Sequence, residues 1–215
     1  MPSPRPHTAP TPHPTPRWTS SPPSVEGLVI RAARADEVDA FFDLTLLVDL
    51  HMPADQLPAL KSTIGEALAD VRPPFSHGLN HFLLATLDDQ PVGAVHVGPA
   101  RWMLDRKIPA RIRRTLVEKV TSVDTIAVHG DHRRQGIATA ILTRVESDFA
   151  AAGYQALALR HEHRMRHFFT AHGFTSLPRL AVDLGPAGLF TEYDREWKYA
   201  VKPSTPPSPS PHSGA

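Results

Sequence analysis

Six consecutive residues in the second half of the chain, Arg133 to Ala138, combine two arginines with a glycine and an alanine. The segment Val123 to Val128 before them is short, apolar and rich in β-branched residues, which predicts a buried strand. After them, apolar residues recur every four positions from Ile137 to Phe149, which predicts a helix. The first amides of a helix have no partner within it and lie at the positive end of its dipole. Gly136 and Ala138 would leave those amides accessible, so this turn is suited to a pyrophosphate.

The alternative for so short a motif is an ordinary strand–loop–helix connection without function. The full string, Arg133 to Ala138 directly after a strand, resembles the acyl-CoA-binding motif of the GNAT superfamily of N-acetyltransferases. That motif has Gln or Arg, then two residues, Gly, one residue, and Gly or Ala. A second similarity lies downstream, where a strand at 156–159 precedes a short helix within Met165 to Phe174 that ends in Gly-Phe. The resemblance covers roughly residues 28–201.

The resemblance implies an α/β fold, with a mixed, mostly antiparallel sheet of six or seven strands that is flanked by helices and splayed where the acyl-CoA enters. It implies acetyl-CoA as co-substrate and direct transfer of the acetyl group to a primary amine of a small molecule or peptide. By match, the amide of Val128 would face the thioester carbonyl. The residues that the resemblance assigns to acyl-CoA binding are Ile126, Ala127, Val128, Arg133, Arg134, Gln135, Gly136, Ile137 and Ala138.

Asp124 is the candidate general base. Ser122, Asp124 and Ile126 alternate onto one face of the predicted strand, and family members often carry Glu at one of the first two positions. A carboxyl group near an apolar site can have a raised pKa that suits proton abstraction. The alternative is a strand-end aspartate that pairs with an arginine or caps a turn.

The usual proton donor of the family is missing. The tyrosine expected four residues before the glycine of the Gly-Phe ending is replaced by Phe169, which cannot donate a proton. Tyr154, Tyr193, His172 or water are the remaining candidates. A catalytically weak or inactive acyl-CoA-binding protein with a regulatory or interaction role is therefore the alternative function.

A cluster of histidines, His161, His163 and His167, raises the question of a metal site, because His163 and His167 have a spacing that a helix can use for ligation. A zincin motif starting at His161 would need histidine at position 165, which is Met165. We expect no metal.

The order of elements matches the family. Leu28 to Ala32 predicts a strand, and two helical patterns follow, from Asp36 to Leu47 and from Leu57 to Val71. A hairpin is predicted for 82–87 and 92–97. Further predictions are a basic helix over Asp105 to Thr121, a strand over Leu180 to Leu184, and a final strand over Thr191 to Val201 that places Tyr193, Trp197 and Tyr199 on one side.

Composition limits the remaining possibilities. Prolines gather at both ends, so we predict disordered tails at 1–24 and 203–215 around an acetyltransferase domain at 25–202. The net charge of +1 gives no indication of nucleic-acid or membrane binding, and a chain without cysteine has no disulfide or thiolate chemistry. We expect a cytoplasmic location. The sequence leaves open whether the chain forms a homodimer.

Overall fold

The computed structural model describes residues 25–204. The predicted proline-rich tails fall almost entirely outside these residues. Pro203 is described, and it is the last residue of the final strand. Seven strands form one sheet in the order β1-β2-β3-β4-β5-β9-β6, and all neighbours are antiparallel except β4 and β5. This confirms the predicted α/β fold with a mostly antiparallel sheet.

The strands of this sheet are β1 (Leu28–Ala32), β2 (His81–Leu87), β3 (Gln90–Pro99), β4 (Val120–Val128), β5 (Ala156–His161), β6 (Thr175–Leu177) and β9 (Lys198–Pro203). A separate hairpin consists of β7 (Arg179–Asp183) and β8 (Leu189–Tyr193). The helices are α1 (Val38–Thr45), α2 (Leu57–Ala69), α3 (Arg101–Leu104), α4 (Ala110–Lys119), α5 (Ile137–Ala151) and α6 (Arg166–Ala171). None of the helices in the described residues is long and apolar enough to cross a membrane.

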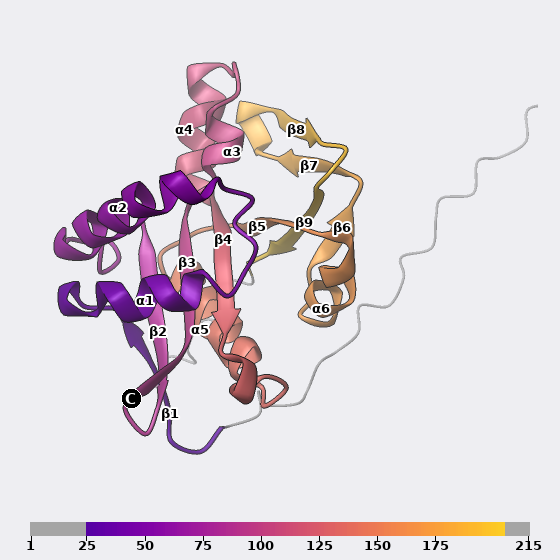
Figure 1. The fold of residues 1–215 in the computed structure, drawn as a ribbon. Coiled ribbons are helices and arrows are strands. Elements are labelled where there is room, and N and C mark those ends of the chain that lie inside the picture. Colours follow the sequence, from indigo (N-terminus) through magenta and orange to yellow (C-terminus); the bar gives the residue numbers. More distant parts are fainter. Residues whose placement is uncertain (1–24, 205–215) are drawn as a thin grey trace, which may run out of the picture.

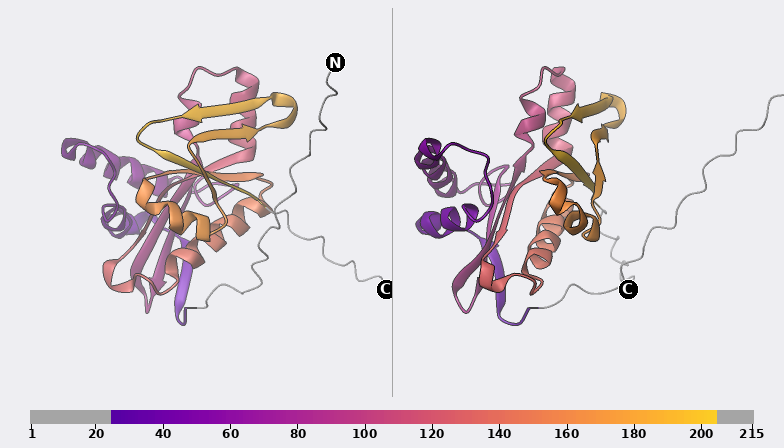
Figure 2. Two further views of the ribbon diagram at one scale, coloured as in Figure 1. Left: turned by 90° about the vertical axis from the view of Figure 1, so that its right-hand side faces the viewer. Right: turned by 45° about the vertical axis from the view of Figure 1, so that its right-hand side comes forward.

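Helices cover both faces of the sheet (Figure 2). On one face, α1 and α2 bury Phe41 and Leu68 against β2 and β3. On the other face, α5 buries the predicted apolar stripe, with Val145 and Phe149 completely inaccessible to solvent. The periodicity of these side chains therefore produces the core that was expected from the sequence.

The predicted β2–β3 hairpin is present and each strand is slightly longer than expected. Asp88 and Asp89 form its turn with positive φ angles of 49° and 62°. Two consecutive left-handed residues match the right-handed twist of the paired strands, and aspartate tolerates this conformation better than most residues do.

The prediction of one helix over Asp105 to Thr121 is wrong. The chain instead forms α3, a connection that ends at Pro109, and α4, which stops at Lys119. Pro109 is the residue before the first turn of α4, where the missing N–H of proline costs nothing. The sheet captures the next residues, Val120 to Ser122, because they pair with β5. β4 therefore begins three residues before the predicted start at Val123.

The single final strand over Thr191 to Val201 is also wrong. Asp194 accepts hydrogen bonds from the amides of Glu196 and Trp197, at 2.8 and 3.3 Å, and thereby turns the chain. Tyr193 ends β8 and is 54% exposed, whereas Tyr199 lies in β9 and is 1% exposed. The expected one-sided array of aromatic rings does not form, because Tyr193 and Tyr199 belong to different sheets and Trp197 lies in the turn between them.

Candidate active site

The two halves of β4 have different neighbours. β4 pairs with β3 from Thr121 to Val128 but with β5 only from Val120 to Ser122 (Figure 1). On the β3 side, the register shifts so that His96 is opposite Thr125 and Val97 is opposite Val123. Asp124 is the extra residue of this β-bulge. The bulge and the loss of β5 occur at the same place, and together they create the predicted splay.

Backbone groups of the second half of β4 are directed into this gap. The amide of His129 donates to the carbonyl of Val92 at 2.8 Å, so this pair belongs to the hydrogen-bonded set of the antiparallel ladder. Since hydrogen-bonded and non-bonded pairs alternate, Ile126 and Val128 direct their N–H and C=O groups away from β3. Ala127 directs its backbone groups toward β3, and its side chain is buried.

The turn after β4 presents a row of amides. Arg134 and Gly136 both have positive φ, at 63° and 89°, and Gly136 is the N-cap of α5. The first amide of this region that bonds to backbone is that of Ala140, which donates to Gly136. Within residues 25–204, no partner occurs for the amides from Arg134 to Thr139. Alternation of left-handed and right-handed residues makes such a row concave and suited to an anion.

The side chains of this turn differ in their exposure and contacts. Arg134 and Gln135 are exposed, and Ile137 is fully buried and anchors the start of α5. The guanidinium of Arg133 donates from Nε to the carbonyl of Val128 at 3.1 Å, which connects the turn to the end of β4. All nine residues predicted to bind acyl-CoA therefore lie on one continuous stretch around the gap.

Asp124 lies on the face of β4 that is opposite α5, beside the gap. Its side chain is 28% accessible, and loss of hydration raises the pKa of the carboxyl group to about 6. A hydrogen bond from Ser122 and the charges of Arg160 and Arg101 lower this pKa, and desolvation outweighs them. The carboxylate is thus ionised at neutral pH but holds its proton more tightly than an ordinary aspartate.

His96 was not recognised from the sequence. Its Nδ1 atom lies 3.6 Å from Asp124 Oδ2, and its Nε2 atom lies 3.2 Å from Asn80 Oδ1. An amide oxygen can only accept, so Nε2 carries the hydrogen and the lone pair of Nδ1 faces Asp124. Burial lowers the pKa of His96 to about 4, which keeps the ring neutral. The ring also stacks on Phe82, with centroids 4.3 Å apart.

Gly98 makes room for this arrangement. A Cβ atom at Gly98 would lie 2.5 Å from Asn80 Oδ1 and 3.4 Å from His96 Nε2. His96 and Gly98 are two residues apart on β3, so both lie on the same face of the strand. This spacing is the only signal in the sequence that could have indicated that His96 and Gly98 are neighbours.

An aromatic wall borders the gap on the side of β5. Trp102 donates from Nε1 to Ser122 Oγ at 3.1 Å and stacks on Tyr199 at 5.2 Å. Arg160 lies between two indoles, 5.6 Å from the ring centroid of Trp102 and 5.3 Å from that of Trp197. Ser122 is completely buried by these contacts, so only Asp124 of the predicted strand-face pair remains accessible.

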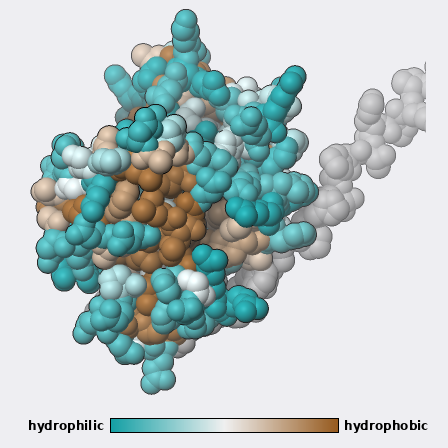
Figure 3. Space-filling view, in the orientation of Figure 1, coloured by the Kyte–Doolittle hydropathy of each residue, from teal (hydrophilic) through white to brown (hydrophobic). Residues whose placement is uncertain are grey.

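The segment between α1 and α2 crosses in front of β4 (Figure 1). His51 in this segment packs edge-on against Trp197 at 4.8 Å and lies 3.8 Å from Glu162. Leu46, Leu47 and Met52 are exposed. Figure 3 shows an apolar area in the middle of this face of the molecule. The segment therefore joins the α1–α2 side of the site to its β5 side.

The candidates for the missing proton donor have other contacts. Phe169 is 5% exposed and packs against Phe168 and Phe174 in the core. His172 has its Nδ1 atom 2.7 Å from the carbonyl of Phe168 and its Nε2 atom 2.8 Å from Thr139 Oγ1, so both nitrogens are engaged. Tyr154 precedes the start of β5 and packs against Phe149 at 5.0 Å. Tyr193 lies on β8, in the separate hairpin. Water is the remaining candidate from the sequence.

One of the histidines considered as metal ligands, His161, has its partners within the protein. His161 is buried, with Nδ1 2.7 Å from the carbonyl of Glu162 and Nε2 2.9 Å from Ser176 Oγ. Its bonding capacity is therefore used within the protein. The side chains that the structure does bring together, Asp49, His51 and Glu162, are at the surface, and Glu162 also pairs with Arg164 at 2.6 Å.

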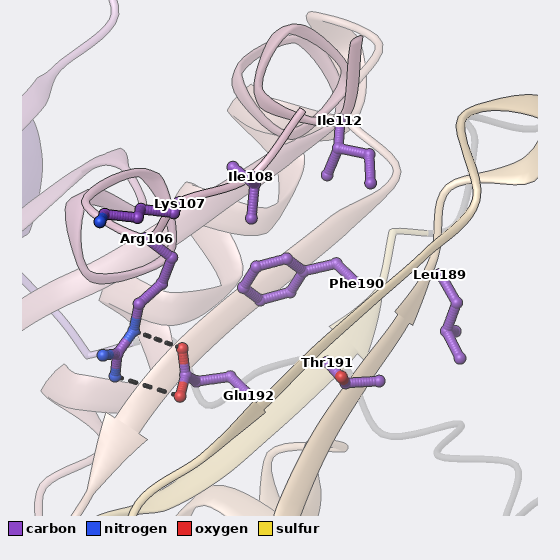
Figure 4. Close-up of a pocket in the computed structure, with 8 residues that line it drawn as sticks. All are labelled: Arg106, Lys107, Ile108, Ile112, Leu189, Phe190, Thr191 and Glu192. Carbon is purple, nitrogen blue, oxygen red and sulfur yellow. Dashed lines mark hydrogen bonds and ion pairs between the residues drawn. The ribbon is translucent and has the colours of Figure 1, made fainter. Parts of the chain in front are cut away.

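A depression apart from this site lies between the α3–α4 segment and the β7–β8 hairpin. It has a volume of about 380 Å³, and Figure 4 shows Phe190 directed toward Ile108 and Ile112 beside the ion pair of Arg106 with Glu192. None of the predicted acyl-CoA-binding residues lines it. Two of the basic residues of the α3–α4 segment, Arg106 and Arg113, are used within the protein. Arg106 pairs with Glu192, and Arg113 donates to the carbonyls of Leu104 and Arg106.

Comparison with known proteins assigns the family. The model of the acetyltransferase (GNAT) family matches residues 47–174, and the chain belongs to this family. Among curated proteins, none matches the chain in sequence.

Solved structures share the fold at low sequence identity. A GNAT family acetyltransferase from Elizabethkingia anophelis with acetyl-CoA bound is 14% identical, with 83% of this chain and 99% of that chain covered and a TM-score of 0.54. The PaiA N-acetyltransferase from Thermoplasma acidophilum in complex with coenzyme A is 11% identical, with 82% and 98% covered and a TM-score of 0.55. The ribosomal-protein-S18-alanine N-acetyltransferase from Escherichia coli is 12% identical, with 86% and 99% covered and a TM-score of 0.53.

Proposed function

We propose that the protein transfers the acetyl group of acetyl-CoA to a primary amine by direct attack, with Asp124 as the general base. The observation that carries this proposal is the coincidence of three features at one place: the end of β4–β5 pairing, an accessible carboxylate with a raised pKa, and the row of free amides that follows. Family membership supports the class of reaction.

The co-substrate would lie along the second half of β4. The amides from Arg134 to Ala138 would bind the pyrophosphate, and Arg133 and Arg134 would add positive charge. The outward-facing backbone groups of Ile126 and Val128 would bond the pantetheine arm and the acyl group, with Ala127 between them. Two of the structural relatives contain acetyl-CoA or coenzyme A, which supports this choice of ligand.

The chemistry follows from these positions. Asp124, ionised at neutral pH, takes a proton from the acceptor ammonium, directly or through water. The neutral amine attacks the thioester carbon, a C–N bond forms, and the N–H of Val128 stabilises the resulting oxyanion. When the intermediate collapses, the C–S bond breaks, the nitrogen loses its second proton, and this proton passes through water to the thiolate. Burial keeps His96 neutral, so its ring does not release a proton that would compete at Asp124.

The alternative is a protein that binds acyl-CoA without catalysis. The burial of Phe169 in the core, with no hydroxyl group at that position, is the observation that favours it. Both proposals require acyl-CoA binding, and only the first requires Asp124.

Calorimetric titration with acetyl-CoA tests the binding site. Glu at Gly136 would place bulk and negative charge where the pyrophosphate is expected, so Gly136→Glu should lose binding by about 100-fold or more. Gly136 has a φ of 89°, a conformation that asparagine accepts. Gly136→Asn therefore separates the effect of backbone strain on binding from the effect of the added negative charge. Gly130→Glu is the matched control, because a Cβ atom there meets nothing within 4 Å. No binding by the wild-type protein would refute both proposals.

A further inference from the structure

Asp124 and Arg160 occupy equivalent positions on two diverging strands. The last pair of the parallel β4–β5 ladder is Ser122 with Ala158. Asp124 and Arg160 each lie two residues beyond this pair. Since side chains alternate along a strand, both project from the same face as Ser122 and Ala158. A carboxylate and a guanidinium therefore stand on the two sides of the opening where β4 and β5 separate.

Arg160 is held in place by aromatic rings rather than by an acid. Its guanidinium lies over Trp102 and over Trp197, and the residue as a whole is exposed. Within residues 25–204 it forms no ion pair or hydrogen bond with a carboxylate. Asp194 is near enough to be influenced by the charge of Arg160, but its Oδ1 atom is bonded to backbone amides. Stacking leaves the N–H groups at the edge of the guanidinium free for a planar anion.

Arg101 adds a second positive charge on the same side. It begins α3, next to Trp102, and its charge lowers the pKa values of both His96 and Asp124. No carboxylate of the described chain pairs with it either. Among the described residues, the two guanidiniums at this opening have no carboxylate partner, so they are available to an anionic group.

We propose that the acceptor is an amine that also carries a carboxylate, with Arg160 and Arg101 binding the carboxylate while Asp124 faces the amine. This inference rests on the proposed function and names the substrate class of that site. Bidentate pairing of Arg with a carboxylate would orient the acceptor across the opening, and the indoles of Trp102 and Trp197 would fix the guanidinium beforehand.

The experiment compares acids with matched amides. Straight-chain ω-amino acids from glycine to 6-aminohexanoate serve as acceptors, each beside the compound in which a carboxamide replaces the carboxylate. Release of the CoA thiol can be followed with a thiol reagent, because the protein has no cysteine to react. We expect an optimal chain length at which the acid exceeds its amide by about tenfold or more in kcat/KM.

Variants at Arg160 test whether this residue causes the preference for the acid. Arg160→Met keeps a long apolar side chain against the indoles and removes the charge, so the preference for the acid should fall to within about twofold. The loss should lie mainly in KM for the acid. Arg160→Lys should retain part of the preference. Arg114→Met, at an exposed position of α4, is the matched control and should keep all of it.

Equal rates for acids and amides in the wild-type protein, or a preference that survives Arg160→Met, would overturn the inference while leaving acetyl transfer intact. If no amine of the series is acetylated, ligand-observed NMR with the same compounds and bound CoA decides. The inference is supported if the acid binds, its amide does not, and Arg160→Met abolishes binding of the acid. It is overturned if this difference between acid and amide is absent. Failure of the proposed function itself would appear separately, as absence of acetyl-CoA binding by calorimetry.

Discussion

The first half of β4, Val120 to Ser122, and the second half, Asp124 to Val128, are continuous in sequence but differ in their surroundings. The first half is bonded to β3 on one side and β5 on the other, and all of its residues are buried. The second half is bonded to β3 alone, and Asp124 is exposed. A hydroxyl at position 122 is consumed by packing, whereas a carboxylate at position 124 is accessible. Sheet pairing, more than residue type, thus separates a structural polar group from a candidate catalytic one.

The β-bulge at Asp124 lies at the boundary between the two halves of β4. Pairing with β5 ends at the same place, so the backbone groups beyond the bulge that point away from β3 face the gap. Four predictions test the contrast between the two halves, beginning with the largest expected effect.

Asp124→Asn should abolish most of the turnover. The amide cannot accept the proton of the acceptor, so we expect kcat to fall by about 10²- to 10⁴-fold. Acetyl-CoA binding should remain, because the amide turn and the backbone of β4 are unchanged. Steady-state kinetics and calorimetry measure the two effects. Full turnover by this variant would remove Asp124 from the mechanism.

Ser122→Asp should destabilise the first half of β4, which is paired on both sides. Ser122 is 0% exposed, and its hydroxyl group accepts a hydrogen bond from Trp102. A carboxylate at this position would be buried and would gain no additional partner. We expect a loss of about 3 kcal/mol or more in the free energy of unfolding, measured by urea denaturation. Asp124→Ser, the reverse exchange in the second half of β4, is the control and should not lower stability at neutral pH, because it removes a carboxyl group whose pKa the fold raises. Equal stability of the two variants would contradict the contrast.

The pH dependence of the reaction should report Asp124. The ionised form is the active one and its pKa is about 6, so kcat/KM should fall about tenfold per unit below pH 6 and level off above it. The effect on stability has the opposite sign. A pKa that is higher in the folded than in the unfolded state means that the folded protein loses stability as pH rises from about 4 to about 6. Asp124→Asn should remove both dependences, and an unchanged profile in this variant would assign them to another group.

Trp102→Phe should produce the smallest effect. The change removes the 3.1 Å hydrogen bond to Ser122 Oγ but keeps an aromatic ring against Tyr199. We expect a loss of about 1 kcal/mol in the free energy of unfolding, with the CoA site intact. Tyr193→Phe, at an exposed ring of the separate hairpin, is a suitable control. A loss as large as that of Ser122→Asp would mean that Trp102 supports the whole sheet.

Much of the fold could be predicted because it depends on local patterns. β1 has the bounds that its run of apolar residues indicated, and α5 begins directly after Gly136 as its four-residue periodicity required. The same holds for the β2–β3 hairpin, whose two aspartates form the turn. Strand, turn and helix preferences act over a few neighbouring residues, so the sequence by itself was sufficient for them.

Other features depended on competition between elements. Val120 and Thr121 continue a helical pattern, but the sheet captures them, because pairing with β3 and β5 satisfies their backbone groups and buries their side chains. Asp194 ends β8 by bonding two amides that a continuous strand would have left to a neighbour. Local propensity cannot decide such cases, since the competing partners are distant in sequence.

The sequence by itself determined the phosphate-type turn, the family resemblance and Asp124 as a candidate base. Only the tertiary structure decided that Asp124 occupies a bulge, that His96 faces it from β3, and that Arg160 stands opposite it between two indoles. The physical reason is that strand register and the divergence of β4 from β5 arise from packing between segments that no single stretch of sequence contains.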